Sequence, residues 1–213
     1  MIRAVVFDVG ETITSDRRFW ADWADWLDAP AYTVAALVGA VVAQGRDNAD
    51  ALRLIRPGLD VAAEYAVREA SGRGERLEEE DLYPDVREGL QALQNAGYWV
   101  GVVGNQTARA AELLRALGLP VNAVATSGEW GVAKPAPAFF ARLSQWSGCA
   151  PEQIVHVGDH PANDVVPARA AGMRTVHLRR GPWGYLWADS AGAAQADWHA
   201  DSLLDLPGLI AGA

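Results

Sequence analysis

Short and nearly uninterrupted runs of apolar, β-branched residues recur along this sequence, separated mostly by segments with helical periodicity. Such runs are typical of strands buried on both faces of a parallel sheet, because a strand with one solvated face alternates polar and apolar residues. We expect five of these strands, at Ile2 to Phe7, Tyr98 to Val103, Val121 to Ala125, Ile154 to Val157 and Thr175 to Leu178.

The segments between the later strands predict helices, at Asp85–Asn95, Thr107–Leu117, Pro137–Trp146 and Pro161–Ala171. A glycine stands where each of them would end, at Gly97, Gly118, Gly148 and Gly172. Alternating strands and helices predict a doubly wound α/β core with a parallel sheet. The tail at 179–200 is interpreted as a loop held by aromatic contacts of Trp183, Trp187 and Trp198.

The alternation is interrupted once, between about Ser15 and Leu82, where no strand pattern occurs. Helical patterns at 17–27, 33–44, 49–55 and 61–70 predict an all-helical insertion. The expected domains are therefore an α/β core of residues 1–14 and 83–213 and a helical domain of residues 15–82. Trp20, Trp23 and Trp26 share one side of the first helix, where packing is favoured over a binding platform. The charged segment Ser71–Asp81 is expected to be a solvated surface.

Composition and charge exclude several classes of protein. The 213 residues carry 27 acidic and 18 basic side chains, a net charge of −9, and no basic block suited to the phosphate backbone of nucleic acids. No apolar run approaches the roughly 18 residues needed to span a membrane. With a single cysteine, Cys149, and no signal-peptide pattern, we expect a cytoplasmic protein without an intramolecular disulfide.

Polar residues follow the predicted strands where ligands bind in open parallel sheets, beyond the carboxyl ends of the strands. Asp8 follows the first strand, Gly104-Asn105 ends the second, and Gly158-Asp159 ends the fourth. Lys134 lies in a loop after the third strand. Asp8 alone could be a turn former or a helix cap, but the joint pattern predicts two carboxylates and a cation at one edge of the sheet.

Lys134 is the only lysine among the 18 basic residues, the others being arginine. Lysine at this one position indicates that a compact ammonium group is needed there, which a planar guanidinium cannot replace. Drift in a GC-rich genome would explain the same observation.

Two aspartates near the end of the fourth strand favour a magnesium site. Asp159 and Asp164 are five residues apart, the first at the end of the strand and the second in the first turn of the next helix, so both carboxylates can face one hard cation. Magnesium prefers oxygen ligands and commonly takes one or two carboxylates. None of the four histidines has a zinc-like spacing. His156 is expected in the core, whereas His160 adjoins Asp159 and could face the site.

Together, these residues resemble the haloacid dehalogenase (HAD) superfamily, most closely its phosphatase branch. Phe7 through Thr12 resembles the first motif, Val102 through Asn105 the second, Lys134-Pro135 the third, and Gly158 through Asp164 the fourth. The helical insertion is similar to the cap that many members carry at this point. The resemblance covers nearly the whole chain and implies a Rossmann-like core with an inserted cap domain.

The resemblance also implies a mechanism for a hydrolase. Asp8 would attack the phosphoryl group of a small phosphorylated substrate and form an aspartyl-phosphate, which water then hydrolyses. Mg²⁺ would be held by Asp8, the backbone carbonyl of Gly10 and Asp159, with Asp164 in support. Lys134 and the N–H groups around Gly104 and Asn105 would bind the phosphoryl oxygens. The chain is expected to act as a monomer or a homodimer.

Two positions depart from the family pattern. Gly10 stands where the phosphatase branch has a second aspartate, the general acid and base, whose contribution is about a hundred- to ten-thousandfold. Gly104 replaces a serine or threonine. Glu11 or His160 could supply the missing acid, and Asn105 or Thr107 the missing phosphate contact. Thr12 and Asn163 are further candidate support residues.

Three hypotheses remain open from the sequence. The first is a magnesium-dependent phosphohydrolase that favours leaving groups needing little protonation. The second is a catalytically impaired relative that binds a phosphorylated ligand. The third is a metal-independent 2-haloacid dehalogenase, which the Asp159 and Asp164 pair argues against. In each case the cap should determine specificity. Arg17 and Arg18 could meet an anionic substrate, although surface solvation is favoured.

Overall fold

A computed structural model describes residues 1–212 of the chain, which divide into two compact units. The first unit contains Met1–Ser15 and the chain from Glu78 onward. The second unit is Asp16–Leu77.

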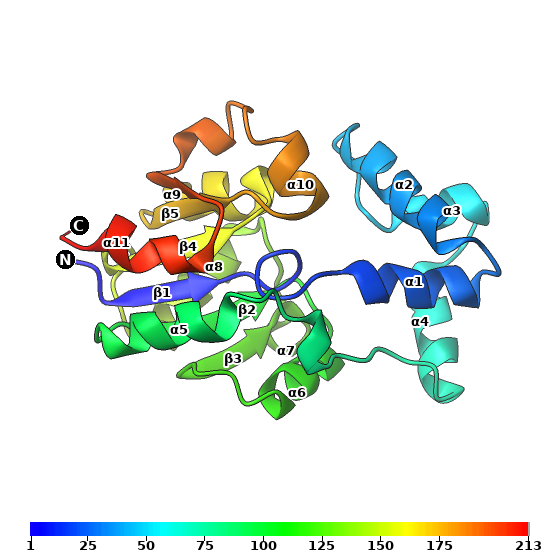
Figure 1. Ribbon diagram of the computed structural model, residues 1–213, viewed down its shortest axis with the longest axis horizontal. Coiled ribbons are helices and arrows are strands. Elements are labelled where there is room, and N and C mark those ends of the chain that lie inside the picture. Colours follow the sequence, from blue (N-terminus) through cyan, green and yellow to red (C-terminus); the bar gives the residue numbers. More distant parts are fainter. Residues whose placement is uncertain (213) are drawn as a thin grey trace. The chain divides into compact units, whose positions relative to one another are not determined.

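The first unit is built on a six-stranded sheet in which every pair of neighbours is parallel. The strands are β1 (Ala4–Phe7), β2 (Trp99–Gly104), β3 (Ala123–Thr126), β4 (Ile154–Gly158), β5 (Arg174–Leu178) and β6 (Trp198–Ala200). Their order in the sheet is β3-β2-β1-β4-β5-β6, so β1 lies between β2 and β4 (Figure 1). This is the doubly wound arrangement, and the predicted fold class of the core is confirmed.

Helices cover both faces of the sheet. Figure 1 shows α5 (Val86–Asn95) and α11 (Leu206–Ile210) on one face and α8 (Pro137–Ser147) and α9 (Val166–Ala170) on the other. The remaining helices of this unit are α6 (Ala108–Ala116), α7 (Ser127–Trp130), α10 (Gly181–Leu186) and short 3-10 helices at 79–81, 151–153, 193–195 and 203–205. The four glycines expected at helix ends all have positive φ, between 57° and 87°, as left-handed helix ends require.

One prediction of secondary structure is wrong, and another differs in detail. The tail was expected to be a loop, but Trp198–Ala200 forms the edge strand β6 beside β5. A strand of three residues is too short for its sequence to show an alternation of polar and apolar residues. The segment is held instead by hydrogen bonds that Arg174 and Thr175 donate to the carboxylate of Asp197, which precedes the strand. The segment predicted as a helix at 161–171 is helical, but its first turn, Pro161–Val165, is π-helical and is followed by α9. Pro167 lacks the backbone N–H that a continuous α-helix would use.

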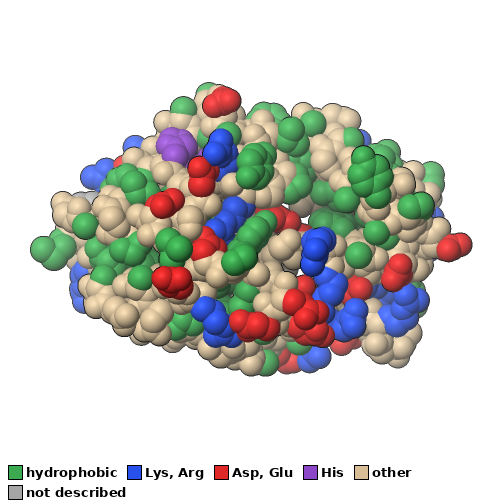
Figure 2. Space-filling model, viewed as in Figure 1, with side chains coloured by type: hydrophobic (Ala, Val, Ile, Leu, Met, Phe, Trp, Pro, Cys, Tyr) green, Lys and Arg blue, Asp and Glu red, His purple; other side chains and the backbone are tan. Residues whose placement is uncertain are grey.

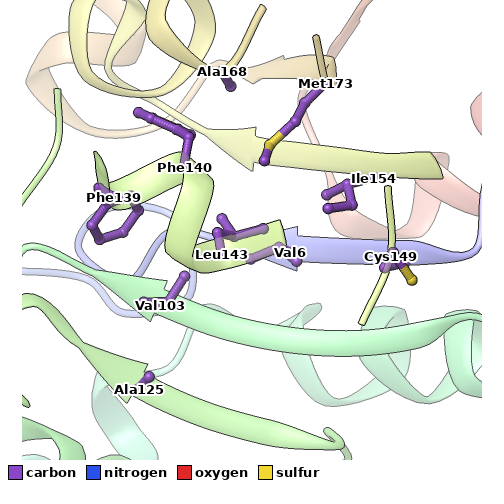
Figure 3. Packing of buried hydrophobic residues seen from close by; sticks show 11 residues of the cluster. Val6, Val103, Ala125, Phe139, Phe140, Leu143, Cys149, Ile154, Ala168 and Met173 are labelled. Atoms are coloured by element: carbon purple, nitrogen blue, oxygen red, sulfur yellow. The ribbon is translucent and has the colours of Figure 1, made fainter. Parts of the chain in front are cut away.

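The core beside α8 holds this face of the sheet in place. Phe139, Phe140 and Leu143 of α8 are fully buried against strand residues such as Val6 and Val103 (Figure 3). Fully burying a side chain of this size contributes about 1.5–3 kcal/mol. Because residues of β1, β2 and β4 belong to the same buried cluster as α8, this packing holds the three strands in position. The polar residues that follow these strands are positioned with them.

The second unit is helical throughout its described elements: α1 (Arg17–Trp26), α2 (Ala31–Val42), α3 (Asp50–Ile55) and α4 (Val61–Ala70). Trp20 and Trp23 are buried, which confirms the predicted packing role for these two indoles, whereas Trp26 is half-buried and donates a 2.8 Å hydrogen bond to Glu64. The Arg68 guanidinium lies 4.3 Å from the centre of the Trp23 ring.

The charged segment before α5 is largely exposed, as predicted, and Asp81 is the buried exception. Asp81 is only 6% exposed, because its carboxylate accepts the backbone N–H of Glu78 and its carbonyl accepts that of Ser15. A short 3-10 helix thus turns the carboxylate inward. On the face drawn in Figure 2, acidic, basic and hydrophobic side chains are interspersed. Within residues 1–212, no helix is both long and apolar enough to cross a membrane.

Candidate active site

The register of the sheet brings the predicted motifs together. Phe7 of β1 lies opposite Val102 of β2 and Val157 of β4. Asp8, which follows Phe7, therefore emerges beside the ends of both neighbouring strands. Its backbone N–H donates to the carbonyl of Val157, which continues the ladder by one residue.

Lys134 joins two of the predicted carboxylates. Its Nζ lies 2.5 Å from Asp8 Oδ1 and 2.6 Å from Asp164 Oδ1, and the lysine is 6% exposed. Burial alone would lower the pKa of Lys134, but the charges of Asp164 and Asp8 raise it above its ordinary value. The ammonium group therefore stays charged at neutral pH.

Asn105 holds the loop that carries Lys134. The Lys134 N–H donates to Asn105 Oδ1, and Asn105 Nδ2 donates to the Lys134 carbonyl, both at 2.8 Å. The end of β2 and the lysine loop are thus joined by a reciprocal pair of hydrogen bonds. The amide group of Asn105 therefore binds the backbone of the lysine loop.

Three buried carboxylates gather at this edge. One oxygen each from Asp8, Asp159 and Asp164 lies within 4.8 Å of the others. Burial raises the pKa of Asp159 well above its usual value, and the charges of Asp8 and Asp164 raise it further. Burial also raises the pKa of Asp8, against the opposing effect of Lys134.

Asp164 behaves differently because the side chains of Lys134 and His156 and one backbone N–H all contact its carboxylate. Burial favours its neutral form, but Lys134 and His156 hold the pKa of the Asp164 carboxyl well below its ordinary value. His156 Nε2 lies 3.1 Å from Asp164 Oδ1, and the backbone N–H of His160 donates to Oδ2 at 3.1 Å.

The donor set fits a divalent cation. Three carboxylates face one ammonium group, and within residues 1–212 Asp159 has no ion-pair partner. Clustered oxygen ligands with excess negative charge suit a hard cation such as Mg²⁺, which would supply the missing positive charge.

The backbone at Gly104 lies so close to Asp8 that it leaves no room for a side chain. A Cβ at this position would lie 2.6 Å from Asp8 Oδ1 and 3.0 Å from Val9 Cγ2. The position where the resemblance implies a hydroxyl side chain is therefore filled by the Asp8 carboxylate. The Thr107 hydroxyl accepts the backbone N–H of Ala110 and caps α6.

The remaining candidate support residues make different kinds of contact. Glu11 has φ of 53° and its carboxylate accepts a hydrogen bond from the Tyr83 hydroxyl. Thr12 is fully buried. The His160 ring stacks on Trp183, with 3.7 Å between ring centroids. Asn163 is half-buried in the π-helical turn.

Sequence reasoning missed two histidines that support the site. His156 is fully buried, as expected for a core residue, but it also binds Asp164. His177 Nε2 lies 3.1 Å from the carbonyl oxygen of Asp159. The sequence did contain a signal for both residues, because each histidine is a polar residue within a run that predicts a strand buried on both faces.

Comparison with known proteins agrees with this geometry. The sequence model of the haloacid dehalogenase-like hydrolase family matches residues 2–172. The chain belongs to this family. Four ordered motifs and the parallel sheet of this HAD-like hydrolase agree with that assignment.

Curated relatives include phosphatases. A glyceraldehyde 3-phosphate phosphatase from Methanopyrus kandleri is 38% identical over 104 residues, which cover 47% of this chain and 45% of the relative. A phosphoserine phosphatase from Thermus thermophilus is 31% identical over 181 residues, covering 72% of this chain and 70% of the relative. The HAD-like hydrolase thus spans about half the length of the Methanopyrus protein that it matches.

A solved structure supports the fold independently. A haloacid dehalogenase-like hydrolase from Bacteroides fragilis superposes with a TM-score of 0.72 and 18% identity, covering 97% of this chain and 100% of that protein. At this identity the similarity shows the fold alone.

Proposed function

We propose that this HAD-like hydrolase is a magnesium-dependent phosphohydrolase that acts on a small phosphorylated metabolite through an aspartyl-phosphate on Asp8. The observation that carries the proposal is the buried pairing of Asp8 with Lys134 beside the unpaired Asp159 carboxylate. A nucleophile, a fixed cation and a cation-binding position are thereby combined at one edge of the sheet.

Lys134 orients the nucleophile. Because its ammonium group holds Asp8 Oδ1, the other carboxylate oxygen is left to attack phosphorus in line with the leaving group. The new bond joins Asp8 oxygen to phosphorus, the bond from phosphorus to the leaving oxygen breaks, and that oxygen takes up a proton from solvent water. Water then hydrolyses the acyl phosphate, which releases phosphate and restores the Asp8 carboxylate.

A negatively charged phosphate can approach the three carboxylates only if positive charge offsets their repulsion. Asp8, Asp159 and Asp164 would hold Mg²⁺, with the Gly10 carbonyl as a further ligand, and the ion would offset repulsion between carboxylates and phosphate when bound. Lys134 would offset charge on the phosphoryl oxygens, and the backbone N–H groups after β2 would bind them.

Gly10 sets the chemical range of the enzyme. It offers no side chain to protonate a leaving oxygen, so we expect a preference for acyl and aryl phosphates over simple alkyl phosphates. The helical unit Asp16–Leu77 corresponds to the cap of related enzymes, and we propose that it selects among phosphorylated substrates.

The proposal is tested by phosphate release from a panel of acyl, aryl and alkyl phosphates, with Mg²⁺ and with a chelator. Asp8→Asn keeps the shape of the side chain and should lower kcat by about a thousandfold or more. Asp25→Asn, at an exposed position of α1, is the control and should match the parent. No magnesium-dependent release, together with equal behaviour of Asp8→Asn and the parent, would exclude the proposed function.

A second candidate function is favoured by the two glycines. With neither an acid at Gly10 nor space for a hydroxyl at Gly104, the chain could bind a phosphorylated ligand without turnover. Calorimetry with phosphometabolites separates the two functions, because tight binding without phosphate release supports the second. Halide release that persists in a chelator would instead support a dehalogenase.

A further inference from the structure

A buried guanidinium group joins the turn after the nucleophile to the start of α5. Arg180 follows β5 and is 7% exposed. Its Nη1 donates to the Thr12 carbonyl at 2.9 Å, and its Nη2 donates to Asp85 Oδ2. The guanidinium carbon also lies 4.4 Å from the centre of the Tyr83 ring. One planar cation therefore makes two hydrogen bonds and an aromatic contact, a combination that lysine cannot reproduce.

The contacts of Arg180 hold an unusual turn. Glu11 has φ of 53°, a conformation that costs free energy for a residue with a side chain and persists only where its surroundings enforce it. The Glu11 N–H donates to the Thr14 carbonyl at 2.6 Å, and the Glu11 carboxylate accepts the Tyr83 hydroxyl. Arg180 therefore holds this turn directly at Thr12 and indirectly through Tyr83.

Arg180 is itself anchored by the surrounding segments. Asp85 Oδ2 also accepts the Ser202 hydroxyl at 2.6 Å and the Leu203 N–H at 2.9 Å, so the acceptor of the guanidinium is fixed. The next residue, Gly181, packs against the turn so closely that a Cβ there would lie 2.5 Å from Glu11 Cβ. The end of β5 thus supports the turn after β1 through a rigid set of contacts.

We infer that Arg180 is a positioning residue, which sets the backbone of Gly10–Thr12 relative to the Asp8 nucleophile. The inference rests on the proposed function. Arg180 acts through the turn and does not touch the reacting atoms. Its loss allows the turn to relax, and a displacement near 1 Å costs about 100-fold in rate where chemistry depends on alignment.

The adjacent arginine provides a matched control. Arg179 lies at the same strand end but pairs with Asp201 on the surface, where the two side chains are 51% and 64% exposed. We expect Arg180→Gln to lower kcat by about 100-fold with KM changed by less than about threefold, and Arg180→Lys to recover little of the loss. Arg179→Gln should change kcat by less than about twofold.

A second measurement does not need activity. Amide hydrogen exchange at Glu11 reports the bond to Thr14, and we expect it to accelerate in Arg180→Gln and Arg180→Lys but not in Arg179→Gln. If Arg180→Gln does not fold, Arg180→Lys carries both measurements.

The outcomes separate this inference from the proposed function. An inactive parent refutes the phosphohydrolase, and the exchange rates then still test the turn. An active parent with an Arg180 variant of unchanged kcat, or with unchanged exchange at Glu11, overturns the positioning role. A loss of stability without a loss of kcat also overturns it.

Discussion

Gly104→Ser tests whether space or chemistry explains the glycine at the end of β2. The substitution restores the type of residue that the family usually has here, so sequence comparison alone suggests a gain of activity. The structure gives the opposite expectation, because the new Cβ would lie 2.6 Å from Asp8 Oδ1 and 3.0 Å from Val9 Cγ2. We expect a large loss of activity.

The magnitude follows from the distances. An ordinary contact between these atoms needs about 3.5 Å, so the Asp8 carboxylate must move by about 1 Å. It cannot do so without disturbing the 2.5 Å bond between Asp8 Oδ1 and Lys134 Nζ. A shift of that size in a nucleophile costs about 100-fold in kcat. Overpacking a buried site lowers the free energy of unfolding by about 1–3 kcal/mol.

The assay compares Gly104→Ser with Gly104→Ala by kcat on an aryl phosphate and by urea unfolding. A collision of Cβ predicts similar losses in both variants, whereas a useful hydroxyl predicts that serine outperforms alanine. Gly208→Ala in α11 is the control, since a Cβ there meets nothing within 4 Å. It should keep kcat and raise the free energy of unfolding by about 0.5–1 kcal/mol.

An increase of kcat in Gly104→Ser would refute this reasoning. So would two variants whose kcat and unfolding free energy stay within error of the parent, because the distances would then not limit the site.

Two other predictions concern buried charges. Lys134→Arg should lower kcat about 100-fold in a variant that still folds, because the larger planar guanidinium must displace Asp8 or Asp164 from the buried site where Nζ now contacts both; steady-state kinetics at saturating Mg²⁺ checks this. Burial acts to raise the pKa of Asp197, but hydrogen bonds from Arg174 and neighbouring donors outweigh it and lower the pKa. The stabilisation is therefore present above the unfolded value of about 3.9 and is lost as pH falls through the folded pKa. Asp197→Asn should lower the unfolding free energy at neutral pH, and urea melts in strong acid should show the difference disappearing.

The core of the fold was predictable because its strands are buried on both faces. Continuous apolar runs such as Ala4–Phe7 are buried on both faces, and the glycines after the helices mark where each helix ends. The edge strand at 198–200 was not predictable. Its position depends on Asp197, whose partners are distant in sequence and close only after the sheet has formed.

The site shows a similar division. Asp8 and Asp159 directly follow strands, so topology brings them to one edge. Lys134 lies after α7, and the hydrogen bonds between its loop and Asn105 hold it there. Arg180 could not be found in this way, since nothing distinguishes one arginine among many until its contacts with Thr12 and Tyr83 exist. The same holds for His156, whose value to Asp164 depends on a 3.1 Å contact rather than on a motif.

The two departures from the family pattern differ in physical origin, and kinetics can separate them. At Gly104 the limit is steric, so any added side chain should slow acyl, aryl and alkyl phosphates by similar factors. At Gly10 the limit is chemical, because the missing group is a proton donor to the leaving oxygen. Its absence should therefore appear in the parent as a steep dependence of kcat on the pKa of the leaving group. A parent enzyme that is insensitive to the leaving group would require another proton donor in the site.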